Sequence, residues 1–291
     1  MTTAFHRPRD AAEALALLEG TGRLPLGGGT QLNSSESRSL RYEAVALEGL
    51  LPRGIGRAGT ALSIGASTTF QDILDSKEAP FALKEAARGM ADRNIRNRAT
   101  VGGNLGADKS CSSLVPALLA LDARLTLLDG RSLRLEKWLE LAPGRQGRSV
   151  IASVVLEPRK GLRAGYARWS RVACDIAILG AAAAFFDQDG IVRGLRLALG
   201  GVAAHARRFP ALEAAFEGKV LPTREGIEGL VSGGDPSGHP YVSPIDDLRA
   251  SAAFKRSRIA SLVADAFANA YVGEANAYVG DAGSHDDEAQ R

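Results

Sequence analysis

The sequence predicts an α+β protein whose two main parts meet near residue 160. Three observations indicate this class. Short apolar stretches alternate with amphipathic ones up to residue 156, residues 157–162 have the composition of a linker, and the second half combines a strand hairpin with a long amphipathic segment. At 291 residues, the chain is long enough for two or three compact parts with separate cores.

The first 50 residues predict a βαβ-like unit. Asp10 and Glu13 have the spacing of a capping box, and a leucine-rich helix follows until Gly20. An apolar strand at 24–26 then leads directly into the glycine-rich segment GGGTQLN. Residues 43–47 have the pattern of the next strand.

Residues 56–160 predict a second, mixed unit. Its expected strands are 62–64 and 149–156, with a hairpin of 124–128 and 132–135 about Asp129-Gly130. Its expected helices are 68–74, 81–93 and 114–121, the last with Pro116 in its first turn, where a missing N–H costs little.

The part from 161 to 271 predicts a short antiparallel sheet with helices. Residues 177–186 and 191–199 form strands about the Asp189-Gly190 turn, although the alanines at 181–184 are equally compatible with a helix. Helices are expected at 211–216, 223–231 and 248–270. The inner face of the last helix is Phe254, Ile259, Leu262, Val263 and Phe267. Residues 272–291 are expected to be a loose tail.

Composition argues against several classes of function. The 36 basic and 33 acidic residues are dispersed, which is not the footprint of a nucleic-acid-binding protein. The charged start and the absence of an apolar run near 20 residues predict a cytoplasmic protein with neither a signal peptide nor a membrane span. The two cysteines, Cys111 and Cys174, match no metal-ligand spacing and cannot hold an iron–sulfur cluster.

Two glycine-rich loops, 26–33 and 100–106, are the candidate binding elements. Successive glycines permit sharp turns and a close approach to a ligand, and their N–H groups can converge on an anion. Thr30, Thr100 and Asn104 add hydroxyl or amide donors. Neither loop has the Rossmann spacing or the P-loop lysine. The residues alone leave two alternatives, an anion site gripped from both sides or two ordinary turns.

Four motifs in order resemble a known family. They are PLGGGTQL, LSIGAST, RNIRNRATVGGNLG and PALLALDARLTLLDG, and the similarity continues through SVIASVVLEP, LALGGVA and SAAFKRSRIASLVADAF. The chain thereby resembles the FAD-binding medium subunit of the molybdenum hydroxylases, the xanthine dehydrogenase and carbon monoxide dehydrogenase family. Within it, the text is most similar to the flavin component of the group assigned as selenate reductases. The resemblance implies a two-subdomain FAD-binding domain of the vanillyl-alcohol oxidase (PCMH) type, with subdomains 1–55 and 56–160. A carbon monoxide dehydrogenase flavoprotein-like domain at 161–271 follows.

The resemblance also implies the cofactor site. The first loop would bind the FAD pyrophosphate, the second would bind FAD as well, and Ile151 would contact the adenine side through its backbone. The implied residues are Leu26, Gly27, Gly28, Gly29, Thr30, Gln31, Leu32, Asn33, Thr100, Val101, Gly102, Gly103, Asn104, Ser113 and Ile151.

Two of the aligned positions depart from the family pattern. Ser113 stands where the family usually has an aspartate, and Ile178 corresponds roughly to a lysine near the flavin. Asp108 and Lys109, which follow the second loop, either touch the cofactor or form a solvated pair. Lys255 and Arg256 either face an iron–sulfur partner or serve as helix-capping and surface residues.

The resemblance implies an FAD-dependent electron-transfer subunit with no catalytic side chain of its own. Electrons would pass between iron–sulfur centres of one partner and NAD+ or another acceptor, with a molybdenum-cofactor subunit completing the complex. The four histidines are read as surface or loop residues without carboxylate partners. Two alternatives stay open: an assembly subunit that has lost FAD, which Ser113 and Ile178 would allow, and a stand-alone flavin oxidase.

Overall fold

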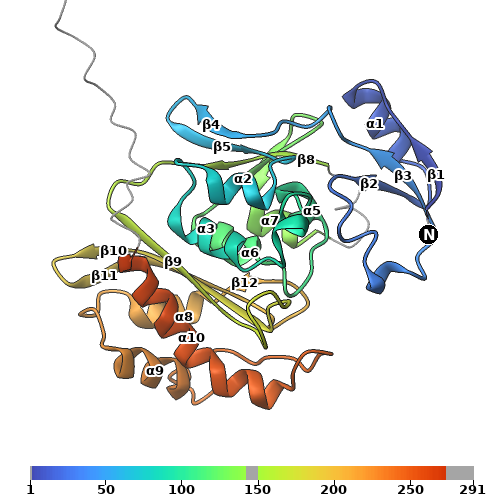
Figure 1. Cartoon of the computed structure of the whole chain (residues 1–291). Helices are drawn as coiled ribbons and strands as arrows, with labels where there is room; N and C mark the ends of the chain where they lie inside the picture. Colours follow the sequence, from blue (N-terminus) through green and yellow to red (C-terminus); the bar gives the residue numbers. More distant parts are fainter. Residues whose placement is uncertain (1, 142–149, 273–291) are drawn as a thin grey trace, which may run out of the picture.

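The computed structural model describes residues 2–141 and 150–272, which form three sheets with helices between and beside them (Figure 1). The N-terminal sheet consists of three parallel strands in the order β1 (Thr2–His6), β3 (Tyr42–Ala46) and β2 (Arg23–Leu26). Helix α1 (Ala11–Leu18) packs on it, and the short 3-10 turn η1 (Ser35–Ser37) lies between β2 and β3. The expected βαβ-like unit is therefore present, although β1 was not predicted.

The second sheet is antiparallel, with strand order β4-β5-β8-β6-β7. Its strands are β4 (Ile55–Ala58), β5 (Ala61–Gly65), β6 (Arg124–Leu127), β7 (Ser132–Arg134) and β8 (Ile151–Leu156). The helices that accompany it are α2 (Phe70–Asp75), α3 (Phe81–Arg88), α4 (Arg93–Arg96), α5 (Val101–Gly106), α6 (Leu114–Ala120) and α7 (Leu135–Leu139). Side chains of this sheet and of these helices other than α4 share one hydrophobic core.

The third sheet is antiparallel as well, with strand order β12-β11-β10-β9. Its strands are β9 (Leu162–Trp169), β10 (Leu179–Gln188), β11 (Ile191–Gly200) and β12 (Arg207–Arg208). Figure 1 shows α3 and α6 on one face of this sheet, and α8 (Pro210–Phe216), α9 (Arg224–Gly233) and α10 (Ala252–Val272) beyond the other. The sheet is thus covered on both faces.

The alanine run in β10 is a strand because both of its faces are buried. Ala182 and Ala184 belong to the core shared with α3 and α6, whereas Ala181 and Ala183 belong to the core beneath α10. Alternation of side chains across the strand places one pair on each face. Small side chains let both helical layers approach the sheet, so the tertiary packing decides an ambiguity that periodicity left open.

Several predicted boundaries were wrong. The segment predicted as one helix at 81–93 is divided into α3 and α4, with Ala91 at φ 36° between them. Strand β9 begins at Leu162, within the predicted linker. It packs closely on α10, since a Cβ at Gly165 would collide with the helix backbone. Helix α10 begins at Ala252 rather than 248, because the preceding residues form a turn in which Asp246 accepts a hydrogen bond from the Ala252 N–H. Ser149 and the tail from 273 onward lie outside the described residues.

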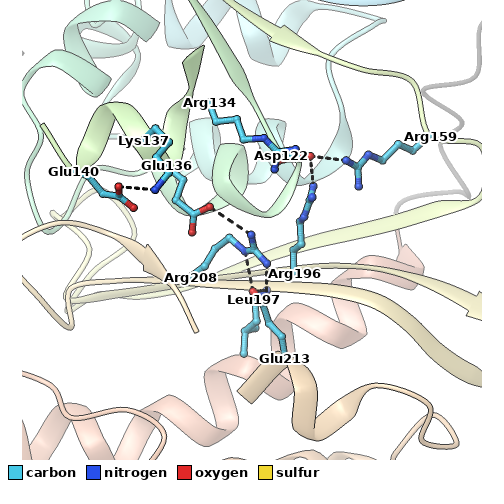
Figure 2. A network of polar contacts seen from close by, with 10 residues as sticks. All are labelled: Asp122, Arg134, Glu136, Lys137, Glu140, Arg159, Arg196, Leu197, Arg208 and Glu213. Carbon is cyan, nitrogen blue, oxygen red and sulfur yellow. Dashed lines mark hydrogen bonds and ion pairs between the residues drawn. The ribbon is translucent and has the colours of Figure 1, made fainter. Parts of the chain in front are cut away.

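An ion-pair network joins the second sheet's layer to the third sheet (Figure 2). Asp122, which follows α6, lies 2.5 Å from Arg159, 2.6 Å from Arg196 on β11 and 3.2 Å from Arg134. Beside it, Arg208 on β12 lies 2.5 Å from a Glu213 oxygen on α8 and 3.5 Å from Glu136 on α7. Each group pairs a charge from the second sheet's layer with one from the third sheet or its helix α8. These pairs favour a fixed relative placement of the two layers.

We expect Asp122→Asn to lower the free energy of unfolding by about 2 kcal/mol, because three guanidinium groups lose their shared negative charge. Differential scanning calorimetry measures this as a lower melting temperature. Asp129→Asn is the matched control, since Asp129 pairs with Arg131 in an exposed turn and its loss costs less than about 0.5 kcal/mol. An equal shift in the two variants would contradict a special role for the network.

Candidate functional site

The two glycine segments meet at the edge of the N-terminal sheet, where β2 ends. A Cβ at Gly28 would overlap the carbonyl oxygen of Arg98 and lie 2.7 Å from its carbonyl carbon. A Cβ at Gly27 would lie 3.2 Å from Oγ1 of Thr100, and Gly29 has a φ of 76°, which favours glycine. Glycine is therefore required here both for close backbone contact and for a left-handed turn.

The first segment presents free backbone donors. Within the described residues, the N–H groups of Gly28, Gly29, Thr30 and Gln31 donate to no protein acceptor. The turn is closed instead by the N–H of Asn33, which donates to the carbonyl oxygen of Gly29 at 3.0 Å. Successive free N–H groups beside a cavity are suited to hold an anion.

The second segment is a helix rather than a loop, which corrects the prediction. Thr100 is the N-cap of α5, and its Oγ1 accepts a hydrogen bond from the Gly103 N–H at 3.1 Å. The N–H groups of Val101 and Gly102 donate to Thr68 and Ala66 at 2.9 and 2.8 Å. Because these donors are used within the protein, Val101 and Gly102 offer no free N–H to a ligand. The second segment contributes a close-packed wall.

Two adjoining cavities lie along the glycine segments, with volumes of about 360 and 230 Å³. Both are lined by six residues, namely Thr30, Gln31, Thr100, Gly103, Ala107 and Lys109. The shared lining makes them one continuous groove. Its size falls within the range of small-molecule and cofactor sites.

Most of the predicted site residues line this groove. The first cavity contains Gly27, Gly28, Gly29, Thr30, Gln31, Leu32, Thr100, Gly102, Gly103 and Ile151, and the second adds Asn104 and Ser113. Three predicted residues line neither cavity, namely Leu26, Asn33 and Val101, the last of which is buried in the core.

The two cavities differ in character. The first extends between Leu47, Leu51, Trp138 and Val150, so its far end is apolar. None of these four was predicted, because they are brought together only when β3, α7 and β8 assemble. The lining of the second cavity includes the polar side chains of Asn104, Ser113 and Arg249.

Residues 174–177 form part of the second cavity, but Ile178 does not. Cys174, Asp175, Ile176 and Ala177 line it, whereas Ile178 is buried in the core beneath the third sheet. The side chain at position 178 is therefore directed away from the groove.

Charged side chains are few along the groove. Lys109 lines both cavities and forms an ion pair with Glu36, while Asp108 lies 3.3 Å from His205. Asp108 and Lys109 thus have different partners. The expectation that the histidines lack carboxylate partners was wrong, since His6 also lies 2.8 Å from Glu43.

Cys111 lines the second cavity as a half-buried thiol. Burial raises its pKa above the ordinary value of a cysteine, and this outweighs the opposing effect of Arg249 and Lys109. The protonated thiol is the stable form at neutral pH, so Cys111 has the character of a small apolar residue of the wall.

Lys255 does not face a partner or the solvent. It is completely buried, with its Nζ 2.8 Å from Asp247 and donating to the carbonyl oxygen of Ile245 at 2.9 Å. Its neighbour Arg256 is exposed. Only Arg256 remains available for contact with another molecule.

Comparison with known families decides what this groove belongs to. Residues 1–158 match the FAD binding domain in molybdopterin dehydrogenase, and residues 164–270 match the CO dehydrogenase flavoprotein C-terminal domain. The chain is an FAD-binding medium subunit of the molybdenum hydroxylase family. The N–H groups of the first glycine segment and the groove beside them therefore lie in the FAD-binding domain of this flavoprotein subunit.

Relatives of the flavoprotein subunit span most of its length. The Escherichia coli K12 protein YgfM is 32% identical, with 92% of this chain and 96% of YgfM covered. The xanthine dehydrogenase FAD-binding subunit of Escherichia coli O157:H7 is 30% identical over 68% of this chain and 73% of its own. The carbon monoxide dehydrogenase medium chain of Hydrogenophaga pseudoflava is 26% identical, covering 89% and 93%.

The fold of the flavoprotein subunit also matches a solved relative. Carbon monoxide dehydrogenase from Hydrogenophaga pseudoflava, in a form lacking the Mo-pyranopterin moiety of its cofactor, superimposes with a TM-score of 0.80 at 26% identity. The match covers 94% of this chain and 98% of that one. The predicted α+β architecture with an FAD-binding and a flavoprotein C-terminal domain is thereby confirmed.

The described part of the flavoprotein subunit contains neither a candidate membrane span nor a candidate metal-ligand cluster. Within residues 2–141 and 150–272, no helix has the length and apolar character needed to cross a membrane. In the same ranges, no group of three or more histidine, cysteine, aspartate or glutamate side chains could hold a metal ion.

Proposed function

We propose that FAD lies along the groove with its diphosphate at residues 28–31 and that the subunit passes electrons between a partner's iron–sulfur centres and NAD+ or another acceptor. The observation that supports this most directly is the run of N–H groups at residues 28–31 that have no acceptor within the described residues. All four residues line the first cavity, and Thr30 and Gln31 line the second as well. Backbone donors that make no bond within the protein are costly unless water or a ligand satisfies them, and a diphosphate suits them.

The two cavities accommodate the two ends of such a cofactor. The apolar end at Leu47, Trp138 and Ile151 suits an adenine ring, and the second cavity, with hydrogen-bonding side chains at Asn104 and Ser113, suits the flavin end. Bound FAD would supply the oxidation–reduction chemistry, through its ability to accept or donate one or two electrons. The chain's own residues bind and orient it and limit access to its ring.

We further propose that the chain works beside an iron–sulfur subunit and a molybdenum-cofactor subunit. The names of its relatives support this, since they include medium chains and an FAD-binding subunit of dehydrogenases. The division at residue 160 is proposed with it, supported by the two matched regions and by separate cores on the two faces of the third sheet.

Purification of the full chain from its native host tests the proposal. We expect a yellow protein whose released cofactor is FAD in about equimolar amount, together with co-purifying polypeptides that carry iron and molybdenum. A colourless chain that does not take up added FAD would contradict the cofactor site and favour an assembly subunit. A yellow chain without such partners would contradict only the proposed complex.

A further inference from the structure

Lys109 has a position that no other charged residue of the described chain shares. Among the residues that line both cavities, it is the single charged one. It follows α5, so its backbone is anchored next to the wall formed by Gly103 and Ala107. Thr30 and Gln31, two of the residues whose N–H groups donate to no acceptor in the described residues, line both cavities as well.

A carboxylate is the hydrogen-bond partner of this cation in the structure. Glu36, in the turn that follows the first glycine segment, forms an ion pair with Lys109 and also lies 3.5 Å from Arg249. The turn is tied to the glycine segment, because Ser37 Oγ donates to the carbonyl oxygen of Gln31 at 2.9 Å. Hydrogen bonding to Lys109 keeps the pKa of Glu36 below its ordinary value, so the carboxylate is charged at neutral pH.

The lining of the groove contains as many cations as carboxylates, but they are not evenly paired. The charged residues that line it are Glu36, Lys109, Asp175 and Arg249. Asp175 is paired with Arg171 at 2.8 Å, outside the lining, and Asp247 beside Arg249 is paired with Lys255. Arg249 lies 3.9 Å from Asp247 and 3.5 Å from Glu36, so Glu36 is the nearest carboxylate of both Lys109 and Arg249. Two cations beside one carboxylate suit an anionic group such as a diphosphate.

We propose that Lys109 binds the diphosphate of the cofactor and that Glu36 is a placeholder which the diphosphate displaces. This inference rests on the proposed function, because it assumes that a dinucleotide occupies the groove. In the free chain, Glu36 keeps Lys109 at the junction; on binding, the phosphate oxygens take its place as acceptor. Lys109 thereby adds a side-chain charge to a site otherwise built from backbone donors.

The exchange predicts effects of opposite sign for the two partners. Lys109→Met should weaken FAD binding by about tenfold or more, since it removes a charge-assisted hydrogen bond. Glu36→Gln should strengthen FAD binding several-fold, because it removes both a competitor for Lys109 and a negative charge beside the phosphates. If the ion pair only maintained the shape of the groove, both variants would instead bind FAD more weakly.

The measurement is a calorimetric or fluorescence titration of the full chain, freed of flavin, with FAD and separately with riboflavin. Riboflavin lacks phosphate, so its affinity should be the same in wild type and Lys109→Met. Lys77→Met and Glu48→Gln are matched controls, because both residues are exposed and line neither cavity. Higher salt should weaken FAD binding to wild type more than to Lys109→Met.

The outcomes separate this inference from the proposed function. Unchanged FAD affinity in Lys109→Met, equal loss of riboflavin binding, or weaker FAD binding in Glu36→Gln would each overturn the exchange while leaving the FAD site intact. Failure of the wild-type chain to bind FAD would overturn both. Opposite shifts for the two variants with unchanged riboflavin affinity would support the inference.

Discussion

Gly28→Ala is expected to weaken FAD binding by roughly a hundredfold, or about 2.7 kcal/mol. The added Cβ would overlap the carbonyl oxygen of Arg98, and a methyl group attached to the backbone cannot rotate away. The first glycine segment must move away from the second, which displaces the N–H groups of residues 28–31 from the groove. Each lost hydrogen bond to a charged group costs about 1.5–3 kcal/mol.

The same substitution should lower the free energy of unfolding by about 1–3 kcal/mol, as overpacking usually does. FAD titration and thermal unfolding of the full chain measure the two effects. Gly56→Ala is the matched control, because Gly56 lies in β4 with open space around its Cβ position. If Gly28→Ala bound FAD as tightly as Gly56→Ala, the close contact of the two segments would not be needed for the cofactor.

Lys255→Met is expected to lower the free energy of unfolding by about 3 kcal/mol, although it leaves no large cavity. Its ammonium group is fully buried, and its loss leaves Asp247 without its closest cation. Asp247 retains only Arg249 at 3.9 Å and the N–H groups of Arg249 and Ala250. Chemical denaturation measures the change. Arg256→Ala is the control, since the neighbouring side chain is exposed and its removal should be nearly neutral.

The pair also predicts an acid dependence. Burial works to raise the pKa of Asp247, but the hydrogen bond from Lys255 and two backbone donors keep it below the ordinary aspartate value. A carboxyl whose pKa is lower in the folded state stabilises the protein above its unfolded pKa, near 4, and this contribution is lost as the pH falls further. Between pH 5 and pH 2, the free energy of unfolding of Lys255→Met should therefore fall by less than that of wild type. Chemical denaturation at a series of pH values measures both.

A double variant separates loss of the pair from loss of packing. Asp247→Asn combined with Lys255→Met removes both charges, so it should be more stable than Lys255→Met alone. A double variant as unstable as the single one would show that the lysine stem, rather than the charge pair, stabilises this region.

Local chemistry made several parts of the fold predictable. The side chain of Asp10 accepts from the Glu13 N–H at 2.8 Å, as the spacing of these residues predicted. The turns at Gly130 and Gly190 have the positive φ angles that an Asp-Gly pair predicts. Each of these features depends on residues within a few positions of one another, so the sequence contains the whole interaction.

Other parts depended on residues far apart in the chain. Nothing local marks β1, which forms a strand because β3 pairs with it across about 40 residues. The glycine-rich sequence of α5 has a low helix propensity. It is helical because Thr100 caps it and the small residues pack against Ala66. Lys255 is typical of a surface residue in the sequence, and only the turn containing Asp247 makes its burial tolerable.

The candidate site shows the same division. The sequence by itself determined the family and the FAD cofactor, and twelve of the fifteen residues it predicted for the site line the groove. It could do so because glycines and their neighbours are local markers of close backbone approach. The tertiary structure decided which glycine segment has free N–H groups, which apolar side chains close the far end, and that Glu36 and Arg249 meet Lys109. These depend on where distant segments come to lie, and burial, close packing and charge pairing between them act only once the chain has folded.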